Sequence, residues 1–386
     1  MTNIGSSALL EADRFLNYNP KAFLYTGAHA PALDVVERAI NFGYEAKSQG
    51  LLGREILFAE EEKSRERIGQ MVGLPSSAIA FIGDASTAWS SIAEGWEWAP
   101  GENIVVNEFE HPSVYYPWLK YKEKGLGIRF AKRQKDWSLP LESIQELCDD
   151  KTTAILISHV GYVTGYRTDL SALGKFASER GIPLLVDLSH SLGVVPIDLK
   201  YCSIAVSASY KWLMGPYGVG IVAWNREMFP KFVPGLVGWR STQNIFNSRR
   251  FEEVTLSADA RRFQMGAPAL AEIAGIGAAA ETILKLGIEN ISRHALAISS
   301  QAHDKLTQMG LNLLTPKSEE FRAGNIAFSH SRGEEFAHSL ALDGIHVWGG
   351  DGRVRASFHV MNNLSDVNTF VDATQELLIK IPLGEI

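Results

Sequence analysis

The chain has 386 residues and a formal net charge of −7 at pH 7; 46% of its residues are hydrophobic and 21% are charged. This composition is typical of a globular protein with a large core, and the length favours more than one domain. The lack of a basic block speaks against a nucleic-acid partner, and no apolar run reaches the roughly 18 residues of a membrane span. The start of the chain lacks the pattern of a signal peptide. Because Cys148 and Cys202 form neither a disulfide framework nor a metal motif, we expect a cytoplasmic protein.

The first 180 residues alternate between helical and strand patterns after an irregular arm at 1–30. Helical spacing of apolar residues at 31–48 and 54–72 predicts two helices. Short apolar runs then alternate with further helical segments, which is typical of an α/β sheet. The predicted strands are 78–82, 103–107, 129–131 and 153–158, and the predicted helices are 88–97, 141–148 and 170–180.

The stretch 183–220 holds the polar residues around which the chain is organised. Two short apolar runs in it predict buried strands; Asp187 follows the first, and Lys211 lies shortly after the second. Open α/β sheets bind ligands just beyond the carboxyl ends of their strands. A lysine there can form a Schiff base with an aldehyde, and an acid can hold a proton on a pyridine nitrogen, which makes the ring an electron sink. The alternative is that Lys211 is a surface lysine and Asp187 a helix or turn cap. This alternative accounts for each residue alone but not for the whole stretch.

The order D-x-x-H, a later K and then G-P-x-G-x-G in this stretch resembles fold-type I pyridoxal-phosphate enzymes. More narrowly, it resembles the class V aminotransferase family, which includes cysteine desulfurases, kynureninases and isopenicillin N epimerase. The resemblance implies an α/β fold with a mainly parallel seven-stranded sheet flanked by helices, and a smaller C-terminal α+β domain. It also implies that Lys211 binds pyridoxal 5'-phosphate, that Asp187 pairs with the pyridine nitrogen, and that His190 reaches the O3′ side of the ring.

Small polar residues at the start of the helix after 78–82 predict an anion site, because a helix N-terminus offers free backbone amides. An ordinary N-cap is the alternative that this segment alone would favour. Beside Lys211, the resemblance implies that the cofactor phosphate is held here. The residues assigned to the phosphate are Ser86, Thr87, Ser209 and Tyr210.

Two further segments are assigned to the cofactor ring. The pattern E-H followed by P-W resembles a desulfurase segment whose histidine lies flat on the ring, which implies this role for His111; a core or capping histidine is the alternative. The segment H-V-G-Y-V-T-G resembles H-V-N-Y-x-T-G of kynureninase. This chain lacks the asparagine that contacts the phenolic oxygen in desulfurases, and Tyr162 is assigned to the cofactor there.

The sequence changes character after residue 260. Long helices at 270–286 and 291–309 precede a small α+β module, so we expect a cofactor-binding domain at 20–260 and a small domain made of 1–19 plus 261–386. The module is expected to hold strands at 325–329 and 354–358 and helices at 334–342 and 366–379.

Substrate and partner contacts are implied by the resemblance. The V-R-x-S segment implies that Arg355 grips the α-carboxylate of a small-molecule amino acid in a bidentate pair; a surface ion pair is the alternative. Tyr25 and Trp239, the latter in a G-W loop, are also assigned to the substrate. The segment 259–269 resembles one that family dimers pass to the partner's phosphate. Gly266 and Ala267 are therefore assigned to the cofactor of a homodimer with shared active sites.

The reaction type stays open, because these parts serve transamination, elimination, cleavage, epimerisation and decarboxylation alike. The R-R-F and G-W-R-S segments favour an aminotransferase; the alternatives are a C–S or C–C lyase (cysteine-conjugate β-lyase or kynureninase-like) or an epimerase. The loop at 345–351 has no cysteine, so we expect that the chain is not a cysteine desulfurase. The Asp187–Lys211 pair speaks against a non-catalytic protein, and the lack of G-x-G-x-x-G speaks against a dehydrogenase.

Overall fold

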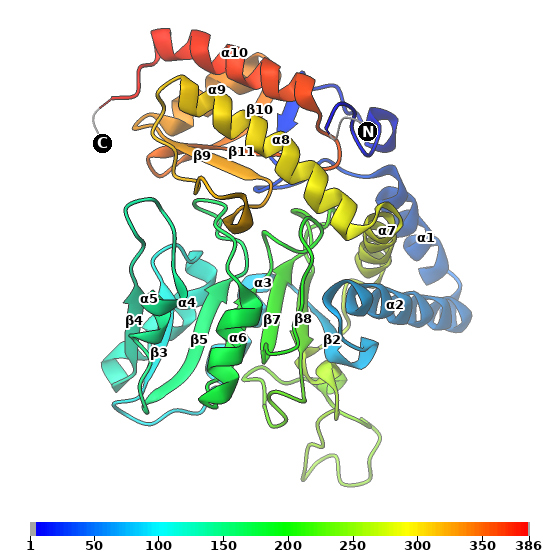
Figure 1. The fold of residues 1–386 in the computed structure, drawn as a ribbon. Helices are drawn as coiled ribbons and strands as arrows, with labels where there is room; N and C mark the ends of the chain where they lie inside the picture. Colours follow the sequence, from blue (N-terminus) through cyan, green and yellow to red (C-terminus); the bar gives the residue numbers. More distant parts are fainter. Residues whose placement is uncertain (1–4, 385–386) are drawn as a thin grey trace.

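A seven-stranded sheet forms the larger part of the structure, a computed structural model that describes residues 5–384. Its strand order is β2-β8-β7-β6-β5-β3-β4, and all neighbours are parallel except that β8 is antiparallel to both β2 and β7. The expected fold class is confirmed (Figure 1). The strands are β2 (Ile79–Ile82), β3 (Asn103–Asn107), β4 (Gly127–Ala131), β5 (Thr152–Ser158), β6 (Leu184–Asp187), β7 (Ile204–Ala208) and β8 (Gly220–Trp224).

Helices cover both faces of this sheet, which is why its central strands are apolar at nearly every position. Side chains alternate between the two faces along β5: Ile155 and Ile157 join one core, whereas Ala154 and Leu156 join the other. The helices over the sheet are α3 (Ala85–Glu94) and α4 (Pro112–Leu119) on one face, and α5 (Leu141–Gln145) and α6 (Leu170–Glu179) on the other.

Three helices form a layer beside the sheet: α1 (Asp34–Lys47), α2 (Gly50–Val72) and α7 (Leu270–Leu286). Small residues let them approach closely. A Cβ atom on Gly43 would lie only 2.7 Å from the Cα atom of Ala271. The hydroxyl of Ser64 donates to the carbonyl of Ile273 at 2.8 Å. α7 therefore links the first helices of the chain to the C-terminal part.

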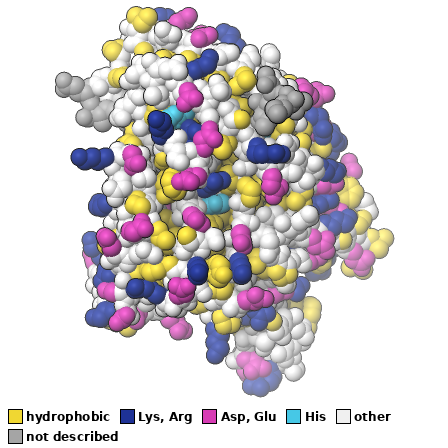
Figure 2. All heavy atoms as spheres, in the orientation of Figure 1, with side chains coloured by type: hydrophobic (Ala, Val, Ile, Leu, Met, Phe, Trp, Pro, Cys, Tyr) yellow, Lys and Arg dark blue, Asp and Glu magenta, His cyan; other side chains and the backbone are white. Residues whose placement is uncertain are grey.

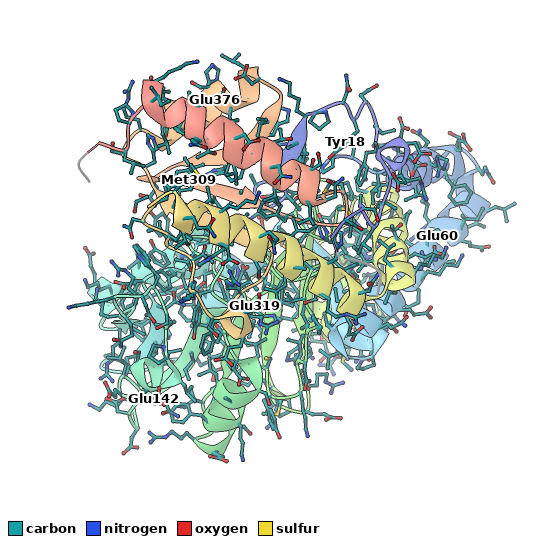
Figure 3. All side chains as sticks on the ribbon, turned by 45° about the horizontal axis from the view of Figure 1, so that its top comes forward. Tyr18, Glu60, Glu142, Met309, Glu319 and Glu376 are labelled. Carbon is teal, nitrogen blue, oxygen red and sulfur yellow. The ribbon has the colours of Figure 1, made fainter. Side chains whose placement is uncertain are left out.

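A four-stranded sheet of order β1-β10-β11-β9 lies beyond the carboxyl ends of the parallel strands (Figure 1). Three helices cover it, and Figure 3 shows α8, which ends beside Met309, crossing this part of the molecule. The elements are β1 (Ala22–Leu24), α8 (Ile288–Gln308), β9 (Asn325–Ser329), α9 (Gly333–Leu342), β10 (Ile345–Gly350), β11 (Arg353–Ser357) and α10 (Leu364–Lys380).

Two expectations from the sequence are corrected in this sheet. The segment 345–351 was expected to be a loop, but its residues 345–350 form β10, which is parallel to β1 and antiparallel to β11. Two consecutive glycines in β10 hid its strand pattern. Asp351 and Gly352 have φ angles of +48° and +69°, as in the two-residue turns that join tight hairpins. The irregular arm expected at 1–30 contains β1.

The division into 20–260 and 1–19 plus 261–386 stays a prediction. The two sheets follow it except at β1, which belongs to the second sheet although it lies after residue 20. Among the described residues, no helix is long and apolar enough to cross a membrane. Figure 2 shows charged side chains of both signs interspersed over the face in view, without a large patch of one sign.

Candidate active site

A cavity lies where β5, β6 and β7 end, at the edge of the large sheet that faces the second sheet. Chain segments far apart in sequence supply its walls, as expected for the carboxyl ends of parallel strands. Seven of the residues predicted from the sequence line it together: Ser86, His111, Tyr162, Asp187, His190, Tyr210 and Lys211.

Lys211 is a base with a lowered pKa in this cavity. Its amine is buried, and burial lowers its pKa to about 8, an effect to which Arg355 adds and which Asp187 opposes. The Nζ atom lies 3.3 Å from Nε2 of His190. An amine with this pKa has a free lone pair in a substantial fraction of molecules near neutral pH, which a nucleophile or a base requires.

His190 is held in one tautomer by its other ring nitrogen. Nδ1 faces the indole N–H of Trp212 at 3.5 Å and the amide Nδ2 of Asn325 at 3.2 Å. Because both are donors, Nδ1 acts as the acceptor, and the proton of the neutral ring lies on Nε2. Burial, aided by the charge of Lys211, holds the pKa of His190 well below its ordinary value. The Nε2–H group therefore points at Lys211 Nζ and favours its uncharged form.

Asp187 is fixed by two donors at the end of β6. The backbone amide of Ser189 donates to Oδ1 at 2.8 Å, and the indole N–H of Trp89 donates to Oδ2 at 3.1 Å. Each carboxylate oxygen keeps a further lone pair, and the residue lines the cavity. A carboxylate oriented in this way suits a protonated ring nitrogen.

Beneath Asp187, Glu110 is a second buried carboxyl group. Burial, with help from the Asp187 charge, raises the pKa of Glu110 to about 7, although three hydrogen bonds act in the opposite sense. These bonds come from the side chain of Asn107 and from the amide and hydroxyl of Ser158. Ser158 itself lines the cavity, so its hydrogen bonds connect Glu110 to the site.

The start of α3 forms the far end of the cavity. Asp84 caps the helix by accepting from the amide of Thr87 at 2.7 Å. Ala85 and Ser86 line the cavity, and the hydroxyl oxygen of Ser86 lies 2.9 Å from that of Ser113. A Cβ atom on Gly220 would lie 2.4 Å from the backbone of Asp84, so only glycine lets β8 pass this close. Two hydroxyls beside a helix N-terminus suit an anion.

His111 and Tyr162 form one wall of the cavity. Their rings meet edge to face, with centroids 5.0 Å apart. The amide of Ser113 donates to Nδ1 of His111 at 3.2 Å, which orients the ring. Burial, followed by the charge of Lys211, lowers the pKa of His111, so the imidazole is neutral near pH 7.

Arg355 approaches the site from β11. Its guanidinium is buried, donates from Nη1 to the carbonyl of Tyr162 at 2.5 Å and lies over the ring of Trp348. Nε has no hydrogen-bond partner among residues 5–384. Burial, with help from Arg353, lowers the pKa of Arg355 to about 9. A buried guanidinium with so few acceptors matches an incoming carboxylate.

Tyr25 lies beside Arg355, because it bridges to Ser357 on the same strand. Gly27 completes this contact: a Cβ atom there would lie 3.1 Å from Nη2 of Arg355. β1 therefore brings the N-terminal arm to the arginine that the sequence assigned to the substrate.

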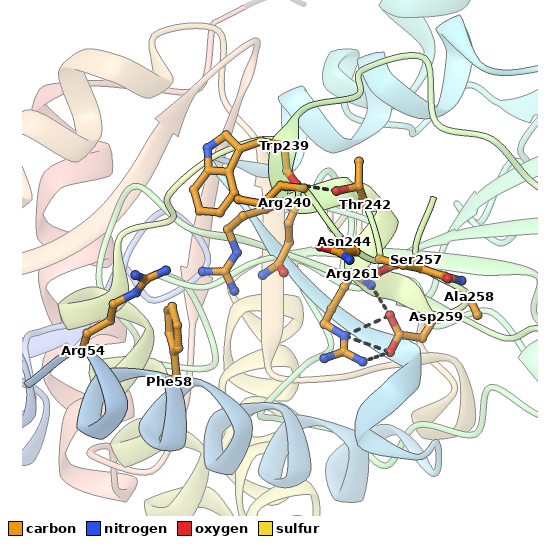
Figure 4. A pocket seen from close by; sticks show the side chains of 13 residues that line it. Arg54, Phe58, Trp239, Arg240, Thr242, Asn244, Ser257, Ala258, Asp259 and Arg261 are labelled. Atoms are coloured by element: carbon orange, nitrogen blue, oxygen red, sulfur yellow. Dashed lines mark hydrogen bonds and ion pairs between the residues drawn. The ribbon is translucent and has the colours of Figure 1, made fainter. Parts of the chain in front are cut away.

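Other predicted residues lie outside this cavity of the single chain. The Ser209 hydroxyl oxygen lies 2.6 and 2.7 Å from the carbonyls of Pro216 and Val219, so it faces the following turn. Thr87, Gly266 and Ala267 are not among the lining residues. Trp239 lines a separate open cavity (Figure 4), opposite Arg54 and Phe58 of α2.

The sequence reasoning did not single out Trp89, Glu110, Ser113 or Ser158. Trp89 occupies an apolar helix position, which the pattern assigns to the core. Ser113 follows His111 by two residues, and this local spacing was the one signal that could have identified it.

The model of the family Aminotransferase class-V matches residues 35–370. A protein of Haloferax volcanii named cysteine desulfurase is 25% identical over 374 residues, which cover 90% of this chain and 86% of the relative. The apo structure of a cysteine desulfurase from Thermococcus onnurineus NA1 superposes with a TM-score of 0.85 at 23% identity and covers 93% of this chain and 95% of that one. The cystine C–S lyase C-DES, in complex with cysteine persulfide, has a TM-score of 0.84 at 19% identity, with 95% and 98% coverage.

These likenesses correct two expectations about the reaction. The prediction that the chain is not a cysteine desulfurase is contradicted, because relatives that match most of the chain have that name. The preference for an aminotransferase is replaced for the same reason. Both expectations depended on single short segments, whereas the likeness extends over nearly the whole chain.

Proposed function

Because the chain belongs to the class V aminotransferase family of pyridoxal-phosphate-dependent enzymes, we propose that it cleaves the C–S bond of a cysteine-type α-amino acid. The buried Lys211 beside Asp187 and His190, within one cavity, is the observation that carries the proposal. The relative from Haloferax volcanii supports a sulfur-containing substrate through its name, and C-DES, which shares the fold, cleaves such a bond.

The residues of the cavity fit the cofactor. The hydroxyls of Ser86 and Ser113 and the start of α3 suit its phosphate, Asp187 suits its ring nitrogen, and the uncharged amine of Lys211 suits its aldehyde. The ring of His111, which lines the cavity beside Tyr162, suits one face of the cofactor ring. When bound, pyridoxal 5'-phosphate supplies an electron sink for the electron pair released at the substrate Cα.

Three side chains of the protein have separate roles in the proposed reaction. Arg355 binds the α-carboxylate and orients the Cα–H bond. Lys211 Nζ would remove the Cα proton, and its lowered pKa suits this role near neutral pH. Asp187 keeps the ring nitrogen protonated. In an elimination, the electron pair from the broken Cα–H bond would form the Cα–Cβ double bond, and sulfur would leave as a thiolate with the C–S pair and take its proton from protonated Lys211. Release of alanine would instead require a thiol that accepts the sulfur.

Product analysis tests the proposal. The loaded enzyme is incubated with cysteine and with S-alkyl cysteines, and alanine, pyruvate, ammonia and released thiol are measured. Alanine with transferred sulfur, or pyruvate with ammonia and thiol, supports C–S cleavage. Conversion of the cofactor to its pyridoxamine form with an intact C–S bond overturns it. Lys211→Ala should abolish product, whereas Lys200→Ala, a change at an exposed lysine, should not.

The fate of the sulfur is followed by persulfide mapping in the same experiment. Both cysteines are buried, and burial raises the thiol pKa to about 11 for Cys148 and about 12 for Cys202. Neither lines the cavity of Lys211. Mapping separates sulfur held on the protein from sulfur passed directly to a thiol in solution.

We also propose that the enzyme is a homodimer with shared active sites. Trp239 and the segment around Gly266 lie away from the Lys211 cavity of their own chain. Leu51 and Leu52 of α2 are 70% and 66% exposed, as expected for residues that a partner covers. Sedimentation should give a dimer; a monomer with full activity contradicts this proposal. The two unpaired cysteines support a reducing compartment, the cytoplasm, as its location.

A further inference from the structure

A second cavity, of about 610 Å³, lies between the two sheets and shares one wall with the Lys211 cavity. The shared residue is Tyr162. From the large domain come Phe109 and Trp137, and from the second sheet comes Arg353. The cavity therefore combines aromatic rings with polar and charged side chains, among them the guanidinium of Arg353.

Arg353 is a buried cation with too few acceptors. Its side chain is 3% exposed, and Nη1 donates to Asp351 Oδ2 at 2.6 Å. Nε and Nη2 are buried without a hydrogen-bond partner among residues 5–384. The guanidinium carbon lies 4.8 Å from the ring centre of Trp348 and 5.3 Å from that of Tyr162. Such contacts stabilise the cation, but they leave in-plane N–H donors without an acceptor.

One aromatic ring separates Arg353 from the cavity of Lys211. The Tyr162 ring lies near both Arg353 and His111: its centre is 5.3 Å from the guanidinium carbon of Arg353 and 5.0 Å from the ring centre of His111. Arg353 and Arg355 lie two residues apart on β11, so they project from the same face of the strand. Both guanidinium groups lie against Trp348. Two cations are thus placed side by side, one of them next to the cavity of Lys211.

We propose that this second cavity binds a carboxylate at the far end of the substrate's side chain, and that Arg353 determines specificity for it. The substrate class is then a cysteine S-conjugate with a second acidic group. The two guanidiniums would bind the two carboxylates, Arg355 the one at Cα and Arg353 the distal one. This inference rests on the proposed function, because it takes the Lys211 cavity as the place where the amino group binds.

The surroundings of Arg353 suit such a ligand. Phe109 and Trp137, whose rings stack on each other, supply apolar surface for the methylene part of a conjugate. The guanidinium of Arg133 also lines the cavity and lies 3.7 Å from the ring centre of Trp137, which adds a second cation. Asp351 competes for Arg353, but its side chain is 75% exposed in the β10–β11 turn, so solvent is open to it when a ligand carboxylate takes its place. Glu108 also lines the cavity, but its carboxylate already accepts a hydrogen bond from the backbone amide of Arg133.

Binding of acids that lack an amino group tests the inference without requiring turnover. Titration calorimetry on the loaded enzyme compares 3,3′-thiodipropanoate with 3-(butylthio)propanoate, a thioether of similar length with one carboxylate. We expect the wild type to bind the diacid roughly tenfold more tightly or better, as a buried charge-assisted pair should give. Arg353→Met should bring the two affinities within about threefold. Arg332→Met, which removes an exposed arginine near the same sheet, should keep the wild-type preference.

A second variant keeps the test decisive if Arg353→Met does not fold. Asp351→Asn removes the competing carboxylate while asparagine tolerates the positive φ angle of this turn, so it should tighten diacid binding by about threefold or more. Equal affinities in the wild type, an unchanged preference in Arg353→Met, or no tightening in Asp351→Asn each overturn the inference. Because none of these measurements needs C–S cleavage, failure of the proposed function alone leaves the binding preference in place.

Discussion

The Nε2 atom of His190 lies 3.3 Å from Nζ of Lys211, and this contact links the protonation of the two groups. Trp212 and Asn325 both donate toward Nδ1 of His190, so the ring proton lies on Nε2 and faces the lysine. A protonated amine cannot accept that hydrogen bond, whereas an uncharged amine can. Burial acts in the same direction on Lys211. The site therefore favours a nucleophilic lysine before any cofactor arrives.

The first prediction concerns the pH dependence of cofactor loading. In the cofactor-free protein, burial lowers the pKa of Lys211 to about 8, so the uncharged fraction rises by about tenfold per pH unit below that value and levels off above it. The rate of covalent pyridoxal 5'-phosphate incorporation, followed by visible absorbance, should show the same dependence between pH 6 and 9. Borohydride reduction and peptide mapping should locate the label on Lys211. A rate independent of pH, or a label on another lysine, contradicts the prediction.

Asp187→Asn should keep the fold and lose most activity. An amide cannot neutralise a protonated ring nitrogen, so the electron sink weakens; we expect a fall in kcat of at least about a hundredfold, as for other groups that stabilise charge in the transition state. Asp198→Asn, at an exposed position, is the matched control. Activity of Asp187→Asn within a few-fold of the wild type would show that the reaction does not need a protonated ring.

Trp89→Phe tests the donor behind Asp187. The indole N–H of Trp89 lies 3.1 Å from Oδ2, and its loss should destabilise the protein by about 1.5–3 kcal/mol, the usual value for a hydrogen bond to a charged group. It should also lower kcat, because Asp187 loses one of the two donors that fix it.

Trp118→Phe is the control for this change. Trp118 is equally buried in the same core, but its Nε1 has no hydrogen-bond partner among the described residues. Both variants lose similar apolar area, so the difference between them isolates the hydrogen bond to Asp187. Equal losses of stability and equal activities would show that the Trp89 contact has no role in the site.

The sequence allowed the prediction of those site residues whose positions follow from local pattern. Asp187 follows an apolar run, and Ser86 starts a helix after a strand, so both could be placed at strand ends. The proximity of Tyr25 and Arg355 was implied only by the family resemblance. Local pattern could not give it, because it depends on β1 joining the edge of a sheet formed some 300 residues later. Arg353 has no local signal, because its lack of acceptors is a property of packing.

Sequence pattern does not determine the direction of a side chain. Ser209 directly precedes the Tyr210–Lys211 pair, which favoured a phosphate contact, yet its hydroxyl lies against the carbonyls of Pro216 and Val219. The position of Ser209 follows from its place in the sequence, but the direction of its hydroxyl is set by the turn that follows Lys211. Its role toward the phosphate stays a prediction.

The last prediction concerns Glu110 and the dependence of stability on pH. Burial raises its pKa to about 7 in the folded protein, above its ordinary value of 4.5. The folded state thus binds more protons than the unfolded state between these values, so this group's stabilising contribution is present below about pH 4.5 and is lost as pH rises through 7. The full effect is on the order of 3 kcal/mol.

Glu110→Gln should remove this loss. The glutamine oxygen can still accept from Asn107 and the amide of Ser158, and its NH₂ group can donate to the Ser158 hydroxyl, which accepts as well as donates. Thermal unfolding of the cofactor-free protein should therefore show a smaller decrease in stability from pH 5 to pH 8 for Glu110→Gln than for the wild type. Glu123→Gln, at an exposed glutamate, should behave as the wild type does. Parallel curves for Glu110→Gln and the wild type would mean that Glu110 is ionised throughout this range, with its three donors outweighing the cost of burial.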